Sequence, residues 1–279
     1  MSNFSIKLDE IKIKELKNTF KNYIKPNSNE YIDTFIQKEG LTISIYKSNK
    51  VVFQGEDAFF YAQAYIDIKE NRQAGSDEVG TGDYFGPVVV CAAIIEEDDY
   101  PFLKENGITD SKQMTDTKIE KIGKQVCDKF KHSVLILENA KYNEVHETNN
   151  LNQIKAKMHN QAYINLLNKG YNIPSEAYID EFCPRNAYFE YLEDVKDIYR
   201  NVEFETKAES KYPAVAVASV IARYTFITYM NEMSKKYQFE FPKGANEIVD
   251  QKIQEFVSKY SKNELKNVAK LHFKNSDKI

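Results

Sequence analysis

The strongest constraint on the fold is an uninterrupted run of eight apolar residues, 88–95, that directly follows a turn rich in glycine. The run has the length of a strand and is rich in β-branched side chains. Apolar residues at every position, rather than at every second one, are typical of a strand buried on both faces. Two adjacent carboxylates, Asp77 and Glu78, lie just before the turn. The sequence therefore predicts that these carboxylates lie beside the central sheet of a layered core.

A change of pattern divides the chain of 279 residues into two parts. In the first part, apolar residues at helical intervals predict an amphipathic helix over residues 8–23, and three short strand-like runs follow it. These strands are expected at residues 31–36, 41–46 and 51–54. A second helical pattern over residues 57–69 ends in a polar segment. We therefore predict a small α+β domain over residues 1–71 and a larger domain over residues 72–279.

Strand-like and helix-like segments alternate through the second part, which is typical of an α/β layer domain. The predicted strands comprise residues 74–78, 86–96, 133–137, 177–180 and 201–205. Apolar residues recur every four positions from Ile154 to Leu166, and residues 212–237 form a long segment rich in alanine and valine. We expect both segments to be helices, the second of them buried against the sheet.

Composition excludes several classes of protein. The net charge is −4, so binding to nucleic acid has to depend on local basic patches rather than on the charge of the whole chain. No run approaches the roughly 20 apolar residues that span a bilayer, and the first residues lack an apolar signal core. This predicts a cytoplasmic protein without membrane contact. The cysteines, Cys91, Cys127 and Cys183, are odd in number and widely spaced, which argues against a disulfide framework or a zinc site and fits a reducing compartment.

Carboxylates at the ends of apolar strands are the candidates for chemistry. Asp77 and Glu78 end one predicted strand, and Asp180 ends another. A carboxylate at the end of a buried strand needs a positive partner or a metal, and oxygen ligands alone favour a hard cation such as Mg²⁺ or Mn²⁺. The spacing by itself equally allows exposed carboxylates beside a glycine turn.

Asp77 and Glu78 can both reach a single site only if the backbone bends. Successive side chains of a regular strand point to opposite faces of the sheet. Gly80 and Gly82 follow directly and tolerate backbone conformations that other residues avoid. We therefore expect a bend at Glu78.

Residues 77–87, with the sequence DEVGTGDYFGP, closely resemble the opening motif of the type 2 ribonucleases H. Three further segments resemble the same family, namely Asp110-Ser111-Lys112 (its Asp-Ser-Lys element), Ile179-Asp180 (its strand-end aspartate) and residues 207–223 (its fourth carboxylate and the following helix). The resemblance covers residues 74–235. It implies a ribonuclease H-like catalytic domain, in which helices flank a mixed sheet.

Two positions depart from the ribonuclease HII pattern within that family. Thr81 stands where ribonuclease HII has an arginine between the glycines, and Glu209 stands where it has an aspartate. Both residues resemble those of ribonuclease HIII. The first part of the chain agrees, because its helix, its short strands and residues 46–55 resemble the TATA-binding-protein-like substrate-binding domain that precedes the catalytic domain in ribonuclease HIII.

The resemblance implies an endonuclease that cuts the RNA strand of RNA/DNA hybrids and leaves 5′-phosphate and 3′-hydroxyl ends. Its catalytic and metal-binding residues would be Asp77, Glu78, Asp180 and Glu209, which together would hold two divalent ions, Mg²⁺ or Mn²⁺, during catalysis. One ion would activate a water for in-line attack, and the other would stabilise the leaving 3′ oxygen. Without metal, we expect mutual repulsion to raise the pKa values of some of these carboxyls.

Substrate choice depends on the 2′-hydroxyl, the group that distinguishes RNA from DNA at each nucleotide. By resemblance, Gly80, Thr81 and Gly82 read the ribose and Lys112 contacts a phosphate, although an ordinary solvated lysine is the alternative for Lys112. The absence of the ribonuclease HII arginine implies a preference for runs of several ribonucleotides over a single embedded one.

The sequence does not decide which surface of the first domain binds the hybrid. It is either the exposed face of the strands or the basic stripe of the first helix, which comprises Lys14, Lys17, Lys21 and Lys25. That stripe by itself is also what a solvated helix face looks like. The four histidines lack metal-ligand spacing, and we interpret them as structural or surface residues: His132, His146, His159 and His272.

Two other functions are compatible with the chain. One is a noncatalytic protein that binds hybrids, which the presence of all four carboxylates argues against. The other is a ribonuclease HII-like enzyme that cuts at single ribonucleotides, which Thr81 and Glu209 argue against. We expect a monomer whose partner is an RNA/DNA hybrid, with no obligate protein partner.

Overall fold

The computed structural model describes residues 3–63, 65, 71–108 and 114–278. The chain forms two compact units, Met1–Lys69 and Glu70–Ile279, and each is described by itself.

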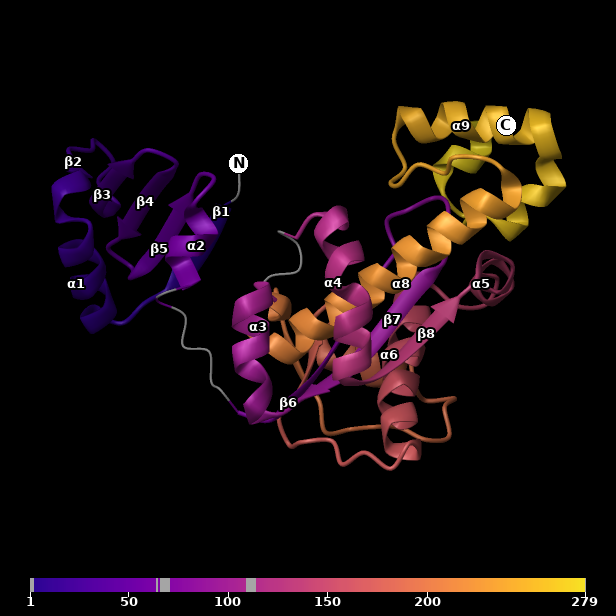
Figure 1. The fold of residues 1–279 in the computed structure, drawn as a ribbon, viewed down its shortest axis with the longest axis horizontal. Coiled ribbons are helices and arrows are strands. Elements are labelled where there is room, and N and C mark those ends of the chain that lie inside the picture. The colour runs from indigo at the N-terminus through magenta and orange to yellow at the C-terminus, as the bar shows by residue number, and fades with distance from the viewer. Residues whose placement is uncertain (1–2, 64, 66–70, 109–113, 279) are drawn as a thin grey trace. The chain divides into compact units, whose positions relative to one another are not determined.

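A five-stranded antiparallel sheet forms the first unit (Figure 1). Its strands are β1 (Asn3–Lys7), β2 (Ile24–Lys25), β3 (Ile32–Lys38), β4 (Leu41–Tyr46) and β5 (Lys50–Gln54), in the order β1-β5-β4-β3-β2. Ile43 and Phe53 pair across β4 and β5 and are buried on one face of the sheet. Helices α1 (Glu10–Thr19) and α2 (Ala58–Gln63) add Leu16 and Ala62 to the same core, so they cover this face.

The start of this unit differs from the sequence-based expectation. The first helix begins at Glu10 rather than at residue 8, because the Asp9 side chain accepts a hydrogen bond from the backbone nitrogen of Lys12 at 2.8 Å and caps the helix. The preceding residues form β1, which the sequence did not predict. β1 pairs with β5, a strand distant in the sequence, and a local pattern cannot reveal such a partner. The second predicted helix, over residues 57–69, is observed as α2, and residues 64 and 66–69 lie outside the described residues.

A mixed five-stranded sheet forms the centre of the second unit, in the order β10-β9-β6-β7-β8. Its strands are β6 (Gln73–Val79), β7 (Val88–Ile95), β8 (Lys131–Leu137), β9 (Ala177–Asp180) and β10 (Glu203–Glu205). β6 pairs antiparallel with β7 and parallel with β9. Every residue of β7 is buried, as its continuous apolar run predicts. The five strands expected from the sequence are confirmed, with bounds that differ by up to two residues.

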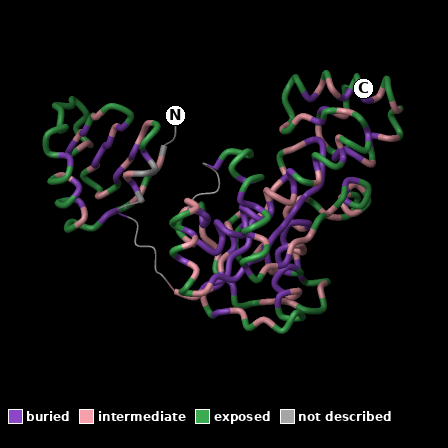
Figure 2. Tube along the Cα trace, in the orientation of Figure 1, coloured by how far each residue is buried: buried purple, intermediate pink, exposed green. Residues whose placement is uncertain are grey.

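Helices cover both faces of this sheet. α8 (Pro213–Tyr237) packs against β6 and β7, and α4 (Asp116–Lys129) packs against α8. On the other face, α6 (Leu151–Asn168) contributes to a core that contains alternate residues of β7. Figure 2 shows the buried residues concentrated in these strands and helices. α8 approaches closely because β6 carries Gly75, where an added Cβ atom would lie 2.3 Å from the backbone nitrogen of Val215.

α8 is long and apolar enough to cross a membrane, with a mean hydropathy of 1.3 over an 18-residue window. The expectation that no segment reaches this length was therefore wrong, because isolated polar residues interrupt the run without lowering its mean hydropathy below that of a spanning helix. In the structure 72% of this window is buried. The apolar surface of α8 forms the core beneath the sheet, as predicted for residues 212–237.

Residues 238–278 form a cap at the end of α8, built on α9 (Glu247–Tyr260) and two short 3₁₀ helices, η5 (Lys262–Asn267) and η6 (Lys274–Lys278). Aromatic rings hold the cap together, since Tyr237 and Phe241 each pack on Phe256 with ring centroids 5.6 Å apart. The remaining short elements are η1 (Lys21–Tyr23), η2 (Glu97–Asp99), α3 (Tyr100–Asn106), α5 (Asn139–His146), α7 (Arg185–Glu190) and η4 (Ala208–Ser210).

Candidate active site

Asp77 lies on β6, on the face that α8 covers. Residues two apart share one face of a strand, so Asp77 points to the same side as Gly75, which contacts α8. Asp77 is 5% exposed, and its carboxyl forms a hydrogen bond with Ser219 of α8. The backbone nitrogen of Glu78 donates a second hydrogen bond to Asp77 Oδ1 at 2.8 Å. The carboxyl is therefore fixed in orientation and almost removed from solvent.

Asp180 and Glu209 reach the same end of the sheet. β9 runs parallel to β6 with Ile179 paired to Ser76, which places the next residue, Asp180, alongside Asp77. The backbone nitrogen of Ala208 donates to Asp180 Oδ1 at 2.9 Å. Glu209 follows Ala208 in η4 and is 3% exposed. The structure thus brings together Asp77, Asp180 and the turn that carries Glu209.

The pKa of Asp77 reflects this crowding. Burial raises it first, the charges of Glu78 and Asp180 raise it further, and together they outweigh the hydrogen bond with Ser219, so that the pKa reaches about 8. The predicted increase in carboxyl pKa is confirmed for this residue. A cluster of buried acids without enough positive charge is the situation that a bound divalent cation relieves, because the cation favours the ionised carboxylates.

Glu78 lies on the opposite face of β6, against α6. Lys155 Nζ is 2.5 Å from Glu78 Oε1, and His159 Nε2 is 2.9 Å from Glu78 Oε2. His159 Nδ1 in turn lies 2.7 Å from Ser76 Oγ. Burial by itself raises the pKa of Glu78, but the hydrogen bond and charge of His159 together with Lys155 hold it at about 2. Glu78 is therefore ionised and has two partners, whereas Asp77 is protonated near neutral pH.

The predicted bend at Glu78 does not occur. β6 stays paired with β7 as far as Val79, so strand alternation separates Asp77 from Glu78. The backbone turns only at Gly80, whose φ is +89°. The sequence reasoning also missed Lys155, and it treated His159 as a structural or surface residue. Their spacing of four within a predicted helix was the signal, since it places both side chains on one face.

The donor atoms suit a hard divalent cation, although the side chains are not yet arranged around one. Carboxylate oxygens are the ligands that Mg²⁺ and Mn²⁺ prefer. Within the described residues, no three His, Cys, Asp or Glu side chains form a group that could hold a metal ion. The engagement of Glu78 by α6 removes one of the four predicted ligands from the others, so a site with all four requires Glu78 to leave Lys155 and His159.

The glycine turn follows β6. At Gly80 an added Cβ atom would lie 2.2 Å from the Pro87 carbonyl oxygen, and the positive φ also favours glycine. Gly82 differs, because its φ is not positive and an added Cβ would meet no atom within 4 Å. Thr81 lies between them and is partly exposed. The fold therefore requires glycine at position 80 but not at position 82.

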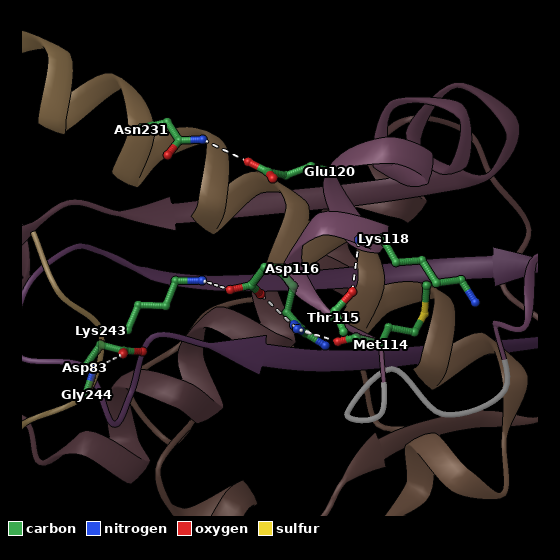
Figure 3. Close-up of polar contacts among 10 residues, drawn as sticks. Asp83, Met114, Thr115, Asp116, Lys118, Glu120, Asn231, Lys243 and Gly244 are labelled. Atoms are coloured by element: carbon green, nitrogen blue, oxygen red, sulfur yellow. Dashed lines mark hydrogen bonds and ion pairs between the residues drawn. The ribbon is translucent and has the colours of Figure 1, made fainter. Parts of the chain in front are cut away.

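The segment with Asp110, Ser111 and Lys112 lies outside the described residues, so the structure does not place Lys112. The residues just after it are firmly held (Figure 3). Asp116 accepts hydrogen bonds from Lys243 Nζ at 2.6 Å and from Arg223 at 3.0 Å. The backbone nitrogen of Gly244 donates to Asp83 Oδ1 at 2.5 Å. Lys243 and Gly244 thus link the start of α4 to the glycine turn.

The other histidines lie away from the four acids. His146 and His272 stack with ring centroids 4.2 Å apart, and His132 Nδ1 lies 2.8 Å from the carbonyl oxygen of Phe130. Cys91, Cys127 and Cys183 are free cysteines.

Comparisons with known protein families match both parts of the chain. The family described as Ribonuclease HII matches residues 74–276, and a domain of unknown function, DUF3378, matches residues 3–78. Among curated proteins, a protein named Ribonuclease HIII from Streptococcus mutans is 39% identical and covers 100% of this chain and 97% of its own length. Another Ribonuclease HIII, from Bacillus cereus, is 37% identical and covers 100% of this chain and 98% of its own.

Solved structures give the same picture. The crystal structure of Bst-RNase HIII in complex with Mn²⁺ is 32% identical, has a TM-score of 0.75, and covers 99% of this chain and 97% of its own. The ribonuclease H2 from Pyrococcus horikoshii is 24% identical with a TM-score of 0.60 and covers 74% of this chain and 96% of its own, a likeness of fold.

Proposed function

This chain belongs to the ribonuclease HIII family, and on that premise we propose that Asp77, Glu78, Asp180 and Glu209 are the catalytic metal ligands of its active site. The protein is an endonuclease that cleaves the RNA strand of RNA/DNA hybrids, and it uses a divalent metal. Its second unit has a ribonuclease H-like fold with a mixed sheet flanked by helices. The observation that carries the proposal is the pairing of the adjacent parallel strands β6 and β9, which places the partly exposed Asp180 alongside the buried Asp77 and near the buried Glu209.

Asp77 and Glu78 lie on opposite faces of β6, while Asp180 ends β9 and Glu209 lies in η4. When bound, two divalent ions, Mg²⁺ or Mn²⁺, would supply an activated water and stabilise the departing 3′ oxygen, giving 5′-phosphate and 3′-hydroxyl ends. Asp77 and Asp180 are already oriented by Ser219 and by the backbone of Ala208. Glu78 completes the set by exchanging Lys155 and His159 for the metal. Loss of the proton from Asp77 accompanies metal binding, because only the ionised carboxylate is a strong ligand.

Gly82 supports a role for the turn in reading the ribose. The fold makes no use of the missing side chain at this position, since a Cβ atom there would meet no atom of the protein within 4 Å. A glycine that the fold does not need leaves room for close approach of a ligand to the backbone. We assign Gly80, Thr81 and Gly82 to the substrate ribose on this basis, and Lys112 to a phosphate by resemblance alone.

The first unit, Met1–Lys69, which corresponds to the domain predicted over residues 1–71, is proposed to bind the hybrid through the sheet face opposite its helices. Of the predicted basic stripe, Lys14 and Lys17 lie on α1, whereas Lys21 and Lys25 lie beyond its end in η1 and β2. Lys17 is partly neutralised, because its Nζ lies 2.5 Å from Asp33 Oδ2. The sheet face opposite α1 and α2 carries a row of paired residues that ends in a lysine at the edge strand: Ser5, Val52, Ser44, Phe35 and Lys25. A sheet face with a basic edge suits the wide and shallow minor groove of an A-form-like duplex and its flanking phosphates.

We further propose that the protein acts as a monomer in the cytoplasm. Its three cysteines are free, which fits a reducing compartment. The absence of the ribonuclease HII arginine, with Thr81 in its place, supports a preference for runs of ribonucleotides.

Cleavage of three labelled duplexes tests this function directly. The substrates are a continuous RNA/DNA hybrid, a DNA duplex with one ribonucleotide, and plain DNA, each incubated with Mg²⁺ or Mn²⁺ and with a chelator as control. We expect chelator-sensitive cutting of the hybrid and much weaker cutting at the single ribonucleotide. Efficient cutting at the single ribonucleotide would overturn the substrate preference. Hybrid binding without any cutting would overturn the catalytic role of the carboxylates.

A further inference from the structure

Lys270 is a buried lysine that the chemistry above does not use. Its side chain is 0% exposed, and burial lowers the pKa of its ammonium to about 7, an effect that the charge of Asp83 partly opposes. Burying a lysine is unfavourable unless its donors are satisfied. Its buried position in the cap, next to the buried Val268 and Ala269, therefore calls for a reason.

The hydrogen bonds of Lys270 converge on the glycine turn, residues 80–86, while its ammonium also lies 5.9 Å from the centre of the Tyr142 ring. Its Nζ donates to the carbonyl oxygens of Asp83 at 2.8 Å and Gly86 at 2.5 Å. Its backbone nitrogen donates to the carbonyl oxygen of Tyr84 at 2.9 Å. Asn139 adds a further hydrogen bond to the Gly86 carbonyl oxygen, at 2.8 Å. Three of the four carbonyl groups of residues 83–86 are thus fixed by donors from outside the turn.

The cap holds the turn along its backbone as well. Phe85 and Ala269 form an isolated antiparallel bridge, and the nitrogen of Gly86 donates to the Val268 carbonyl oxygen at 2.9 Å. Gly86 itself has a φ of +84°, which glycine adopts readily, but holding it in this one conformation costs conformational entropy. Backbone hydrogen bonds from residues 268–270 therefore hold residues 84–86 in this conformation.

We propose that Lys270 is a positioning residue of the reaction, which sets the backbone of residues 83–86 so that the preceding residues, Gly80 to Gly82, present their backbone to the substrate ribose. The inference rests on the proposed function of these glycines. Lys270 is buried behind the turn, so it would not contact the substrate directly. It acts through the turn, because both carbonyls that it holds belong to the turn.

Replacement of Lys270 by methionine tests this role, since methionine keeps an unbranched side chain of similar length but removes the donors. The variant is compared with the wild type in steady-state cleavage of a continuous RNA/DNA hybrid, in competition by a plain DNA duplex, and in the rise of Tm caused by Mn²⁺. We expect KM for the hybrid to rise by about tenfold or more, because a displaced turn weakens a contact made in the bound substrate. The Mn²⁺-induced rise in Tm and the inhibition constant of the DNA duplex stay at wild-type values.

Lys259→Met is the matched control. Lys259 also donates from the cap to a backbone carbonyl oxygen, that of Gln238 at 2.9 Å, but it does not contact the turn. We expect this variant to keep the wild-type KM.

Two results would overturn the inference. One is a folded Lys270→Met variant with the wild-type KM, and the other is loss of the Mn²⁺-induced rise in Tm, which would assign Lys270 to the metal site. If Lys270→Met does not fold, Asn139→Ala removes the other side-chain donor to the Gly86 carbonyl, and a normal KM in that variant would equally refute the role of the turn's anchors. Failure of the wild-type enzyme to cut the hybrid is a separate result, which would contradict the proposed function itself.

Discussion

At the scale of single residues, Asp77 makes the metal-free protein sensitive to pH. Its pKa is about 8 in the folded chain, against an ordinary value of 3.8. Between these pH values the folded state binds one more proton than the unfolded state, so stability falls as the pH rises through this window. Asp77→Asn removes this dependence, and we expect it to raise the stability of the chelator-treated protein at pH 8 by at least about 1 kcal/mol.

Thermal melts at pH 5 and pH 8, with a chelator, measure this effect. The control is Asp98→Asn, which alters an exposed aspartate of η2. If Asp77→Asn and the wild type lose stability equally between pH 5 and pH 8, Asp77 does not carry the raised pKa.

Lys155 provides the charge that balances Glu78 in the absence of metal. Lys155→Met leaves a buried carboxylate with only His159, and we expect a loss of about 3–5 kcal/mol in the free energy of unfolding. Saturating Mn²⁺ is expected to reduce this loss, because the metal becomes the partner of Glu78. Denaturant unfolding with and without Mn²⁺ gives both values.

Lys157→Met is the control on the same helix. Lys157 pairs with Asp194 at 2.7 Å in a more exposed position, and such a pair contributes about 0–1 kcal/mol. An equal loss for Lys155→Met with and without Mn²⁺ would show that Glu78 keeps Lys155 when the metal binds.

The sequence predicted the acids but not their surroundings. Asp77 and Asp180 lie at the ends of apolar strands, and this local pattern indicates them as candidates without any resemblance to a family. Lys155 and His159 belong to a helix far along the chain, so only the packing of α6 on the sheet brings them to Glu78. The separation of Asp77 from Glu78 follows from regular pairing as far as Val79, which the sequence could not settle against a bend.

At the scale of elements, the two glycines of the turn after β6 have different roles. Gly80→Ala places a Cβ atom 2.2 Å from the Pro87 carbonyl oxygen at a φ of +89°, and we expect it to destabilise the fold by about 1–3 kcal/mol. Gly82→Ala meets open space, so we expect an unchanged Tm but a higher KM for the hybrid. Melting curves and steady-state kinetics of the two variants separate structure from recognition. A normal KM for Gly82→Ala would argue against contact with the ribose.

Elements with a strong local pattern were predictable, and those that depend on distant partners were not. The apolar run of β7 and the alanine-rich sequence of α8 both specify burial directly. β1 and the contact of the cap with the glycine turn have no such signal. The bridge between Phe85 and Ala269 joins residues at opposite ends of the second unit, and its donors are mainly backbone atoms that every sequence contains.

At the scale of the whole molecule, the two units suggest a division between binding and chemistry. A chain that begins at residue 72 keeps the four carboxylates and lacks the first unit. We expect a higher KM for the hybrid with little change in kcat, because the removed unit adds affinity without touching the scissile bond. Circular dichroism establishes that the shortened chain is folded. An unchanged KM would show that the first unit does not bind substrate.

Overall charge was the least informative property of the sequence. A net charge of −4 gives no sign of a nucleic-acid enzyme, because the acids proposed to bind the metal contribute to the same sum as the surface lysines. The features that indicate the function are the motif around Asp77 and the position of this motif at the centre of the sheet.

Single-turnover cleavage of a continuous RNA/DNA hybrid by the wild type and by Asp180→Asn tests the central claim most directly. Both proteins are assayed with Mn²⁺ and with a chelator, and thermal melts and hybrid binding are measured in parallel. The account predicts metal-dependent cutting of the RNA strand by the wild type, and no detectable cutting by a folded Asp180→Asn variant that still binds the hybrid. Cutting by Asp180→Asn at close to the wild-type rate would contradict the assignment of the carboxylates as catalytic metal ligands.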